Sequence, residues 1–207
     1  STDTTTTTEA AVTEAPAASI SDAATTADST PADASEEGSD AQTVYPVTVT
    51  DQAGREVTIE KEPESIVSGY YISTSLLLAL GLKDKVTGIE AKADKRPIYK
   101  LAAPEFLELP NVGTAKEFDL ETCASLSPEL VILPMKLKDA AQSLSELDIP
   151  VLLVNPESED QLEQMIELVS TATNTKENAD ALLSYIDEKK EMLEKDLSGV
   201  DAESVYL

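Results

Sequence analysis

The residues with the most binding chemistry lie in short polar loops in the middle of the chain. They are two tyrosines, four cations, a threonine and a methionine: Tyr70, Tyr71, Lys92, Arg96, Thr114, Lys116, Met135 and Lys136. Aromatic rings and cationic groups bind a ligand by contact and charge. Between Lys83 and Lys138 there are nine basic and nine acidic residues, whereas the whole chain has a net charge of −25. We therefore predict a ligand site in these loops.

Each of these residues also has an ordinary structural interpretation. A single lysine can simply be solvated at the surface, and a tyrosine can pack in the core. Tyr70 and Tyr71 are adjacent, so in an extended chain their rings point in opposite directions. We predict that one ring packs beneath the loop and the other faces the ligand.

The sequence contains no motif for catalysis by histidine, cysteine or an activated serine. It has no histidine, and Cys123 is its one cysteine, which excludes a His-based or Cys-based metal site and an internal disulfide within these 207 residues. We predict that Cys123 is a small core residue. Glu117, Asp119 and Glu121 could form an acid–base cluster, so a small α/β carboxylate-dependent hydrolase is an alternative.

The stretch 112–134 shows how the loops are positioned. Asp119 stands where a helix N-cap is expected, ahead of a short helix over residues 120–126. Ser127 precedes Pro128 and ends that helix, because the residue before a proline avoids the α conformation. Residues 130–133 form a continuous apolar run, as expected for a strand buried on both faces.

Similar patterns predict the rest of an α/β fold. We expect a hairpin that turns at Gly54 and strands at 65–68, 86–89 and 151–154. A first helix should be capped by Ser73 or Thr74 and end at Leu80. Further helices are expected at 138–147, 159–172 and 175–197, the last of them with a capping box from Asn174 to Glu177. Residues 91–109 look irregular. Loops after parallel strands emerge at one edge of the sheet, so the eight candidate residues should share that edge.

Composition limits the partners. The first 43 residues hold nine acidic and no basic residues and almost no large apolar one, which predicts a disordered tether. Nucleic-acid binding needs a basic footprint that this acidic chain lacks. The same charge disfavours direct adsorption to anionic lipid, and the longest aliphatic run is far too short to span a bilayer.

Nine residues within 113–132 carry a family resemblance. They are Gly113, Leu120, Glu121, Leu126, Pro128, Glu129, Leu130, Val131 and Ile132, and the hairpin residues Asp51, Gly54, Arg55, Val57 and Ile59 add to them. This pattern resembles the class III substrate-binding proteins of ABC importers, which carry iron–siderophore complexes, haem or cobalamin. Glu129 stands where an aspartate is more usual. The resemblance covers about residues 44–207.

The resemblance implies a Rossmann-like lobe with a short, mainly parallel sheet flanked by helices. Its expected domains are a tether at 1–43, an N-terminal lobe at 44–173, a long inter-lobe helix at 174–199 and the start of a second lobe at 200–207. The rest of the second lobe is expected to be missing after Leu207. If so, Leu193, Leu197 and Val205 should be more exposed than Leu182 and Ile186, because their partner is absent. Equal burial would favour a domain complete in itself.

The resemblance also implies a function without catalysis. The protein would be an extracytoplasmic, lipid-anchored monomer that carries a metal chelate, most often a ferric siderophore, to an ABC permease. Such chelates are commonly anionic, which suits Lys92, Arg96 or Lys116, and only tyrosines or carboxylates could ligate iron directly. Glu121 matches the glutamate that pairs with permease arginines, and no cofactor is expected. A surface adhesion or scaffold module on a stalk is the remaining alternative.

Overall fold

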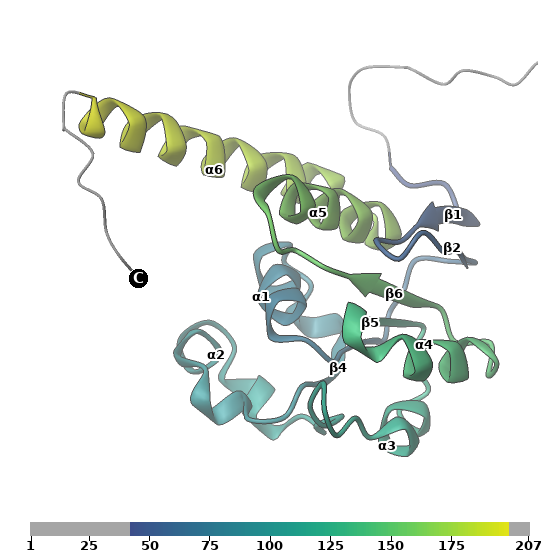
Figure 1. The fold of residues 1–207 in the computed structure, drawn as a ribbon. Helices are drawn as coiled ribbons and strands as arrows, with labels where there is room; N and C mark the ends of the chain where they lie inside the picture. Colours follow the sequence, from purple (N-terminus) through teal and green to yellow (C-terminus); the bar gives the residue numbers. More distant parts are fainter. Residues whose placement is uncertain (1–41, 199–207) are drawn as a thin grey trace, which may run out of the picture. The chain divides into compact units, whose positions relative to one another are not determined.

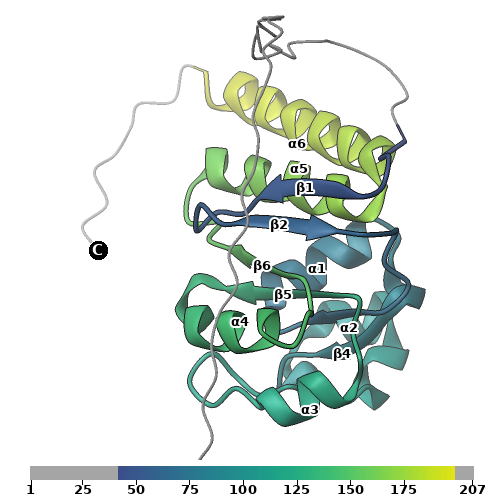
Figure 2. The ribbon, with the colours of Figure 1, turned by 90° about the vertical axis from the view of Figure 1, so that its right-hand side faces the viewer.

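The computed structural model describes residues 42–198, shown in two views in Figures 1 and 2. The expected tether, apart from its last two residues, and the expected strand at Val205 lie outside this range. The strands are β1 (Val47–Thr50), β2 (Glu56–Ile59), β3 (Ile66–Ser68), β4 (Val86–Ile89), β5 (Leu130–Pro134) and β6 (Val151–Val154). The helices are α1 (Tyr71–Ala79), α2 (Pro97–Ala102), α3 (Leu120–Ser125), α4 (Lys138–Ser145), α5 (Glu159–Thr173) and α6 (Lys176–Leu197).

Four strands form one parallel sheet in the order β4-β3-β5-β6. Alternate residues of the strands point to opposite faces, so Leu130 and Ile132 of β5 enter one core while Val131 and Leu133 enter the other. Helices α1, α5 and α6 pack on the first face, and α3 and α4 on the second (Figure 1). The predicted α/β fold with helices on both faces of a parallel sheet is confirmed.

The N-terminal hairpin is joined to this sheet through its turn. Strands β1 and β2 pair antiparallel, and Gly54 has the positive φ (78°) that the turn requires. The Asp51 carboxylate accepts a hydrogen bond from the backbone N–H of Leu153 in β6. Arg55 pairs with Asp51 and also donates to the carbonyl of Val151 at 2.7 Å. Asp51 and Arg55 therefore attach the hairpin to the edge strand β6.

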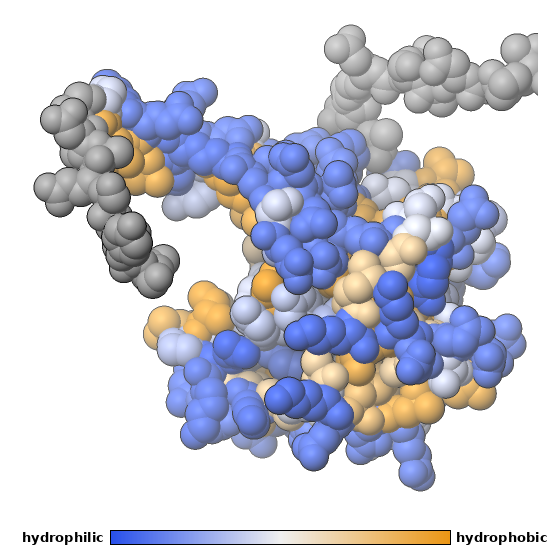
Figure 3. Space-filling model, viewed as in Figure 1, coloured by the Kyte–Doolittle hydropathy of each residue, from blue (hydrophilic) through white to orange (hydrophobic). Residues whose placement is uncertain are grey.

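Helix α6 packs along only part of its length. Ala179 is buried, and Leu182 and Ile186 are half-buried against the core. Leu193 and Leu197 are 56% and 62% exposed, which confirms the predicted contrast with Leu182 and Ile186. Figure 3 shows hydrophobic surface along this distal part of the helix. Val205 lies outside the described residues. Over residues 42–198, no helix has both the length and the apolar character needed to cross a bilayer.

Two helix starts differ from the prediction. Helix α1 begins at Tyr71 with Tyr70 as its N-cap, and not after Ser73 or Thr74. The hydroxyls of Ser73 and Thr74 are buried within the helix, where Ser73 donates to the carbonyl of Tyr70 and Thr74 donates to Glu90, and these bonds compete with capping. Asn174 does not cap α6. It ends α5 in the left-handed conformation, and its amide bonds to Thr43 and Glu62 instead.

Two further expectations along the chain are wrong. The stretch 91–109 is not irregular, because Pro97 and Pro104 each occupy the first turn of a helix, α2 and a 3-10 segment, where the missing N–H has no cost. Leu147 does not share the buried face of Ala141 and Leu144 but is 57% exposed. Helix α4 ends at Ser145, so the helical period no longer applies two residues later.

Candidate functional site

The loops that follow β3, β4, β5 and β6 leave the sheet at one edge, because the four strands are parallel. The loop around Thr114 joins this edge, since Asn111 forms a parallel bridge with Ile89 and Ala91 donates to the Gly113 carbonyl at 2.8 Å. All eight candidate residues lie in these segments: Tyr70 and Tyr71 after β3, Lys92 and Arg96 after β4, Thr114 and Lys116 in the extra loop, and Met135 and Lys136 after β5. Ligand binding by them remains a prediction.

Tyr71 and Arg96 form the best-defined part of this edge. The guanidinium carbon of Arg96 lies 4.0 Å from the centre of the Tyr71 ring, a cation–π arrangement. The Tyr70 ring meets the Tyr71 ring edge to face, with centroids 5.2 Å apart. The two rings therefore do not point in opposite directions, because Tyr71 begins a helix and the chain is not extended there. Tyr70 is half-buried against the core and Tyr71 is exposed, so one ring is packed and one is open. That the open ring faces a ligand stays a prediction.

The other five candidates share the edge with less defined surroundings. Lys92, Lys116 and Lys136 are exposed, and Thr114 and Met135 are half-buried. Lys92 has a positive φ of 68°. The Thr114 hydroxyl accepts hydrogen bonds from the backbone N–H groups of Lys116 and Glu117, at 3.3 and 3.2 Å. Thr114 therefore shapes its own turn, whereas the lysines supply charge to the edge.

Sequence reasoning missed Glu90, which is only 6% exposed at the end of β4. Its carboxyl accepts hydrogen bonds from Thr74 and from the Tyr99 hydroxyl, each at 2.7 Å. Burial raises the pKa of Glu90, while these two bonds and the charge of Arg96 oppose the rise. The available signal was an acidic residue directly after the apolar run 86–89, where a ligand edge was already expected.

The loop from Gly113 to α3 is held by its own backbone. Thr114 donates to the Glu117 carbonyl at 3.0 Å, and Asp119 donates to the Val112 carbonyl at 2.9 Å. The predicted N-cap is confirmed, because the Asp119 carboxylate accepts from the Thr122 N–H at 2.8 Å, and the bonds from Thr122 lower the pKa of Asp119. Glu121 is exposed in the first turn of α3.

Cys123 and the three acidic residues near it do not form a reactive centre. Cys123 is fully buried, as predicted, and burial raises the pKa of its thiol to about 12. Glu117, Asp119 and Glu121 are exposed, and Asp119 is occupied as a helix cap. Within residues 42–198, no three acidic or cysteine side chains are grouped so as to hold a metal ion.

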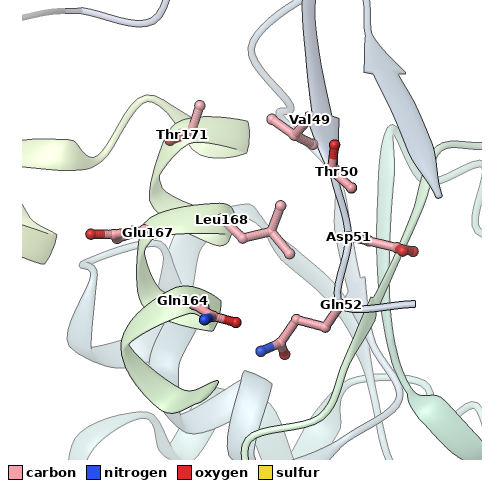
Figure 4. A pocket seen from close by; sticks show the side chains of 8 residues that line it. All are labelled: Val49, Thr50, Asp51, Gln52, Gln164, Glu167, Leu168 and Thr171. Carbon is pink, nitrogen blue, oxygen red and sulfur yellow. The ribbon is translucent and has the colours of Figure 1, made fainter. Parts of the chain in front are cut away.

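An open cavity of about 350 Å³ lies between β1, the hairpin turn and α5 (Figure 4). It is lined by Val49, Thr50, Asp51, Gln52, Gln164, Glu167, Leu168 and Thr171. Gln52 is already used there, since its amide donates to the Gln161 carbonyl at 2.8 Å and accepts from the Asn155 N–H at 2.7 Å. This cavity contains none of the eight candidate residues, and its Gln52 bonds tie the hairpin to α5.

The fold and its edge define a class of protein: an α/β lobe with the candidate loops at the carboxyl ends of a parallel sheet, followed by a long helix. The family described as "Periplasmic binding protein" matches residues 66–207, and the chain belongs to this family. Its members bind solutes and are not enzymes, so the interpretation as a carboxylate hydrolase is wrong. The chain is 33% identical over 165 residues to the uncharacterized ABC transporter substrate-binding lipoprotein YvrC of Bacillus subtilis, covering 74% of this chain and 50% of YvrC.

Solved structures share this fold. A periplasmic solute binding protein from Veillonella parvula superimposes with a TM-score of 0.67 at 26% identity, over 75% of this chain and 49% of that protein. The molybdate-binding protein MolA of Haemophilus influenzae gives 0.68 at 22% identity, over 75% and 55%. The petrobactin-binding protein YclQ of Bacillus subtilis gives 0.64 at 22% identity, over 75% and 54%. The chain thus spans about half the length of the relatives it matches.

Proposed function

We propose that this chain is the N-terminal lobe and inter-lobe helix of the substrate-binding component of an ABC importer. It captures a metal chelate, most consistently a ferric siderophore with haem or cobalamin as related cargoes, and presents it to a permease. The observation that carries the proposal is the Arg96 guanidinium stacked on the exposed Tyr71 ring at the carboxyl edge of the sheet. A cation on an aromatic face offers both charge and flat contact to an anionic chelate.

Family membership and the relatives support this cargo. Among the solved relatives are proteins named for binding petrobactin, haem and molybdate, all ligands that contain or bind a metal. The lysines at the edge add positive charge in a chain that is otherwise strongly acidic. In the proposed role the protein is extracytoplasmic and held at the cytoplasmic membrane by a lipid anchor, as the name of its lipoprotein relative suggests.

A ligand titration of the protein tests the proposal. The sequence has no tryptophan, so its fluorescence comes from six tyrosines, of which Tyr70 and Tyr71 lie at the proposed site. Equilibrium dialysis provides an independent measurement for the coloured ligands. Ferric siderophores, haem and cobalamin are the probes. We expect saturable binding of one of them, weakened about tenfold by Tyr71→Ala or Arg96→Ala because each removes the cation–π pair.

The matched control is Tyr185→Ala, which removes an exposed tyrosine from α6. It should leave the affinity unchanged while lowering the tyrosine signal. Absence of saturable binding to all three ligand classes would contradict the proposed cargo.

A further inference from the structure

Glu90 connects the two helices that carry the Tyr71–Arg96 pair. Its Oε2 accepts a hydrogen bond from Thr74 in α1, and its Oε1 accepts one from Tyr99 in α2. Tyr71 is the first residue of α1, and Arg96 is the N-cap of α2. One buried carboxyl therefore fixes the spacing of the two helix starts that hold the stacked pair.

Glu90 also acts on Arg96 through its charge. The Nε of Arg96 is buried and has no hydrogen-bond partner among the described residues. Arg96 caps the helix whose Tyr99 binds the Glu90 carboxyl at 2.7 Å, so the two groups lie at the same end of α2. In agreement with this placement, the positive charge of Arg96 opposes the rise in the pKa of Glu90. Since Glu90 is almost fully buried, water screens this interaction less than it screens charges at the surface.

A chain of hydroxyls allows Glu90 to gain or lose a proton in place. The Thr74 Oγ1 lies 2.7 Å from Glu90 Oε2 and 2.8 Å from Ser68 Oγ. Ser68 Oγ lies 2.7 Å from Ser73 Oγ, which donates to the Tyr70 carbonyl at 2.8 Å. Each hydroxyl has one proton to donate, so the chain can point toward an ionised Glu90, or away from a neutral Glu90 toward that carbonyl. In the ionised state the chain has one proton fewer and gives up the bond from Ser73 to the Tyr70 carbonyl, and neither state requires movement of heavy atoms.

We propose that Glu90 is a positioning residue that sets how strongly the Tyr71–Arg96 pair attracts an anion. An ionised Glu90 offsets part of the Arg96 charge, and a neutral Glu90 leaves that charge whole. Affinity for an anion therefore rises as Glu90 takes up a proton, and by linkage a bound anion favours that proton. An uncharged ligand of similar shape has no such dependence. The inference rests on the proposed ligand site.

The other groups that face Glu90 do not compete for this role. Thr74 from α1 is not titratable at these pH values. Tyr99 from α2 is fully buried, and burial and its bond to Glu90 raise its pKa above the ordinary value, so it remains a neutral donor. The variable charges at this point are therefore Glu90 and the ligand, with Arg96 permanently positive.

Two chelates of different charge test the proposal on the full chain. A trianionic iron(III) tris-catecholate and an uncharged iron(III) tris-hydroxamate are titrated into wild type, Glu90→Gln and Glu60→Gln. At neutral pH, Glu90→Gln should bind the tris-catecholate at least about fivefold more tightly than wild type does. This factor is the lower end of the change in affinity that coupling between two sites usually produces. Its affinity for the tris-hydroxamate should not change. Glu60→Gln removes an exposed charge after β2 and should match wild type for both.

The pH profile and a direct titration complete the test. Acidification should close the difference between wild type and Glu90→Gln for the tris-catecholate, within the range where that probe keeps its charge. In carboxyl-selective NMR, Arg96→Gln should raise the pKa of Glu90, because it removes the neighbouring cation. A purely structural Glu90 would change the affinity for both chelates alike and would titrate independently of Arg96, and either result would overturn the proposal.

Failure of the proposed cargo is a separate outcome. If neither chelate binds to wild type, the proposed function fails for these two classes, while the NMR comparison still decides whether Glu90 and Arg96 are coupled. The NMR comparison also decides the matter if Glu90→Gln does not fold.

Discussion

The carboxylate of Asp51, in the turn of the hairpin, accepts a hydrogen bond from the backbone N–H of Leu153 in β6 at 3.1 Å. The Asp51 side chain is fully buried and also pairs with Arg55 at 2.7 Å. We expect Asp51→Ala to lower the free energy of unfolding by about 3 kcal/mol, because it leaves a partly buried cation and a buried N–H without their acceptor. Urea denaturation measures the loss. Asp94→Ala removes a solvent-exposed partner of Lys95 and should cause no measurable change, so equal losses in the two variants would contradict this role.

Gly113 and Gly54 have similar backbone angles but different surroundings. Both have positive φ, 85° and 78°. A Cβ on Gly54 would meet open space, whereas one on Gly113 would collide with the backbone carbonyl oxygen of Glu117. Gly54→Ala should therefore cost about 1 kcal/mol of unfolding free energy from backbone strain alone. Gly113→Ala should cost about 3 kcal/mol, because a backbone shift is added to that strain. Comparable urea midpoints for the two variants would argue against a tight Gly113 loop.

Glu121 is the residue expected to contact the permease. It lies exposed in the first turn of α3, where an arginine could bind its carboxylate with two hydrogen bonds. We expect Glu121→Arg to leave ligand affinity unchanged and to abolish uptake by the complete importer in cells. Glu177→Arg is the matched control, since Glu177 occupies the same exposed helix-start position in α6. Normal transport by the Glu121 variant would exclude this docking role.

Cys123 should be inert in the folded protein. Its side chain is fully buried, and burial raises its pKa to about 12, with the nearby charge of Asp119 adding to the rise. At pH 8 a disulfide reagent should react about a thousandfold more slowly with the native protein than with the protein in urea, because the thiolate is the reacting form. Rapid labelling under native conditions would place Cys123 at an accessible site.

Glu90 should make stability depend on pH in a predictable direction. Its pKa is raised in the folded state, mainly by burial. Its contribution to stability is therefore full below the unfolded-state pKa and is lost as pH rises through the higher folded-state pKa. The unfolding free energy of wild type relative to Glu90→Gln should fall across that interval. Urea denaturation of both proteins at several pH values measures this difference, and a difference that is constant with pH would mean that Glu90 does not titrate as described.

Local patterns were sufficient for several elements. The run 130–133 predicts β5 because a strand buried on both faces must be apolar at every position. The Asp119 cap is predictable because the bond reaches only to Thr122. Asn174 has the same local signal as a cap but ends α5, because Thr43 and Glu62, more than a hundred residues earlier, bind its amide. Tyr71 was expected in a loop for a related reason, since nothing nearby in sequence shows that the helix starts there.

The sequence by itself determined the α/β order of the chain and the shared edge of its candidate loops. Both follow from short-range periodicity and from the rule that parallel strands end on one side of a sheet. Only the tertiary structure decided which side chains meet there. Arg96 reaches Tyr71, and Glu90 reaches Thr74 and Tyr99, because the first turns of α1 and α2 meet at the end of β4. Such contacts depend on the relative placement of whole elements, which no residue spacing encodes.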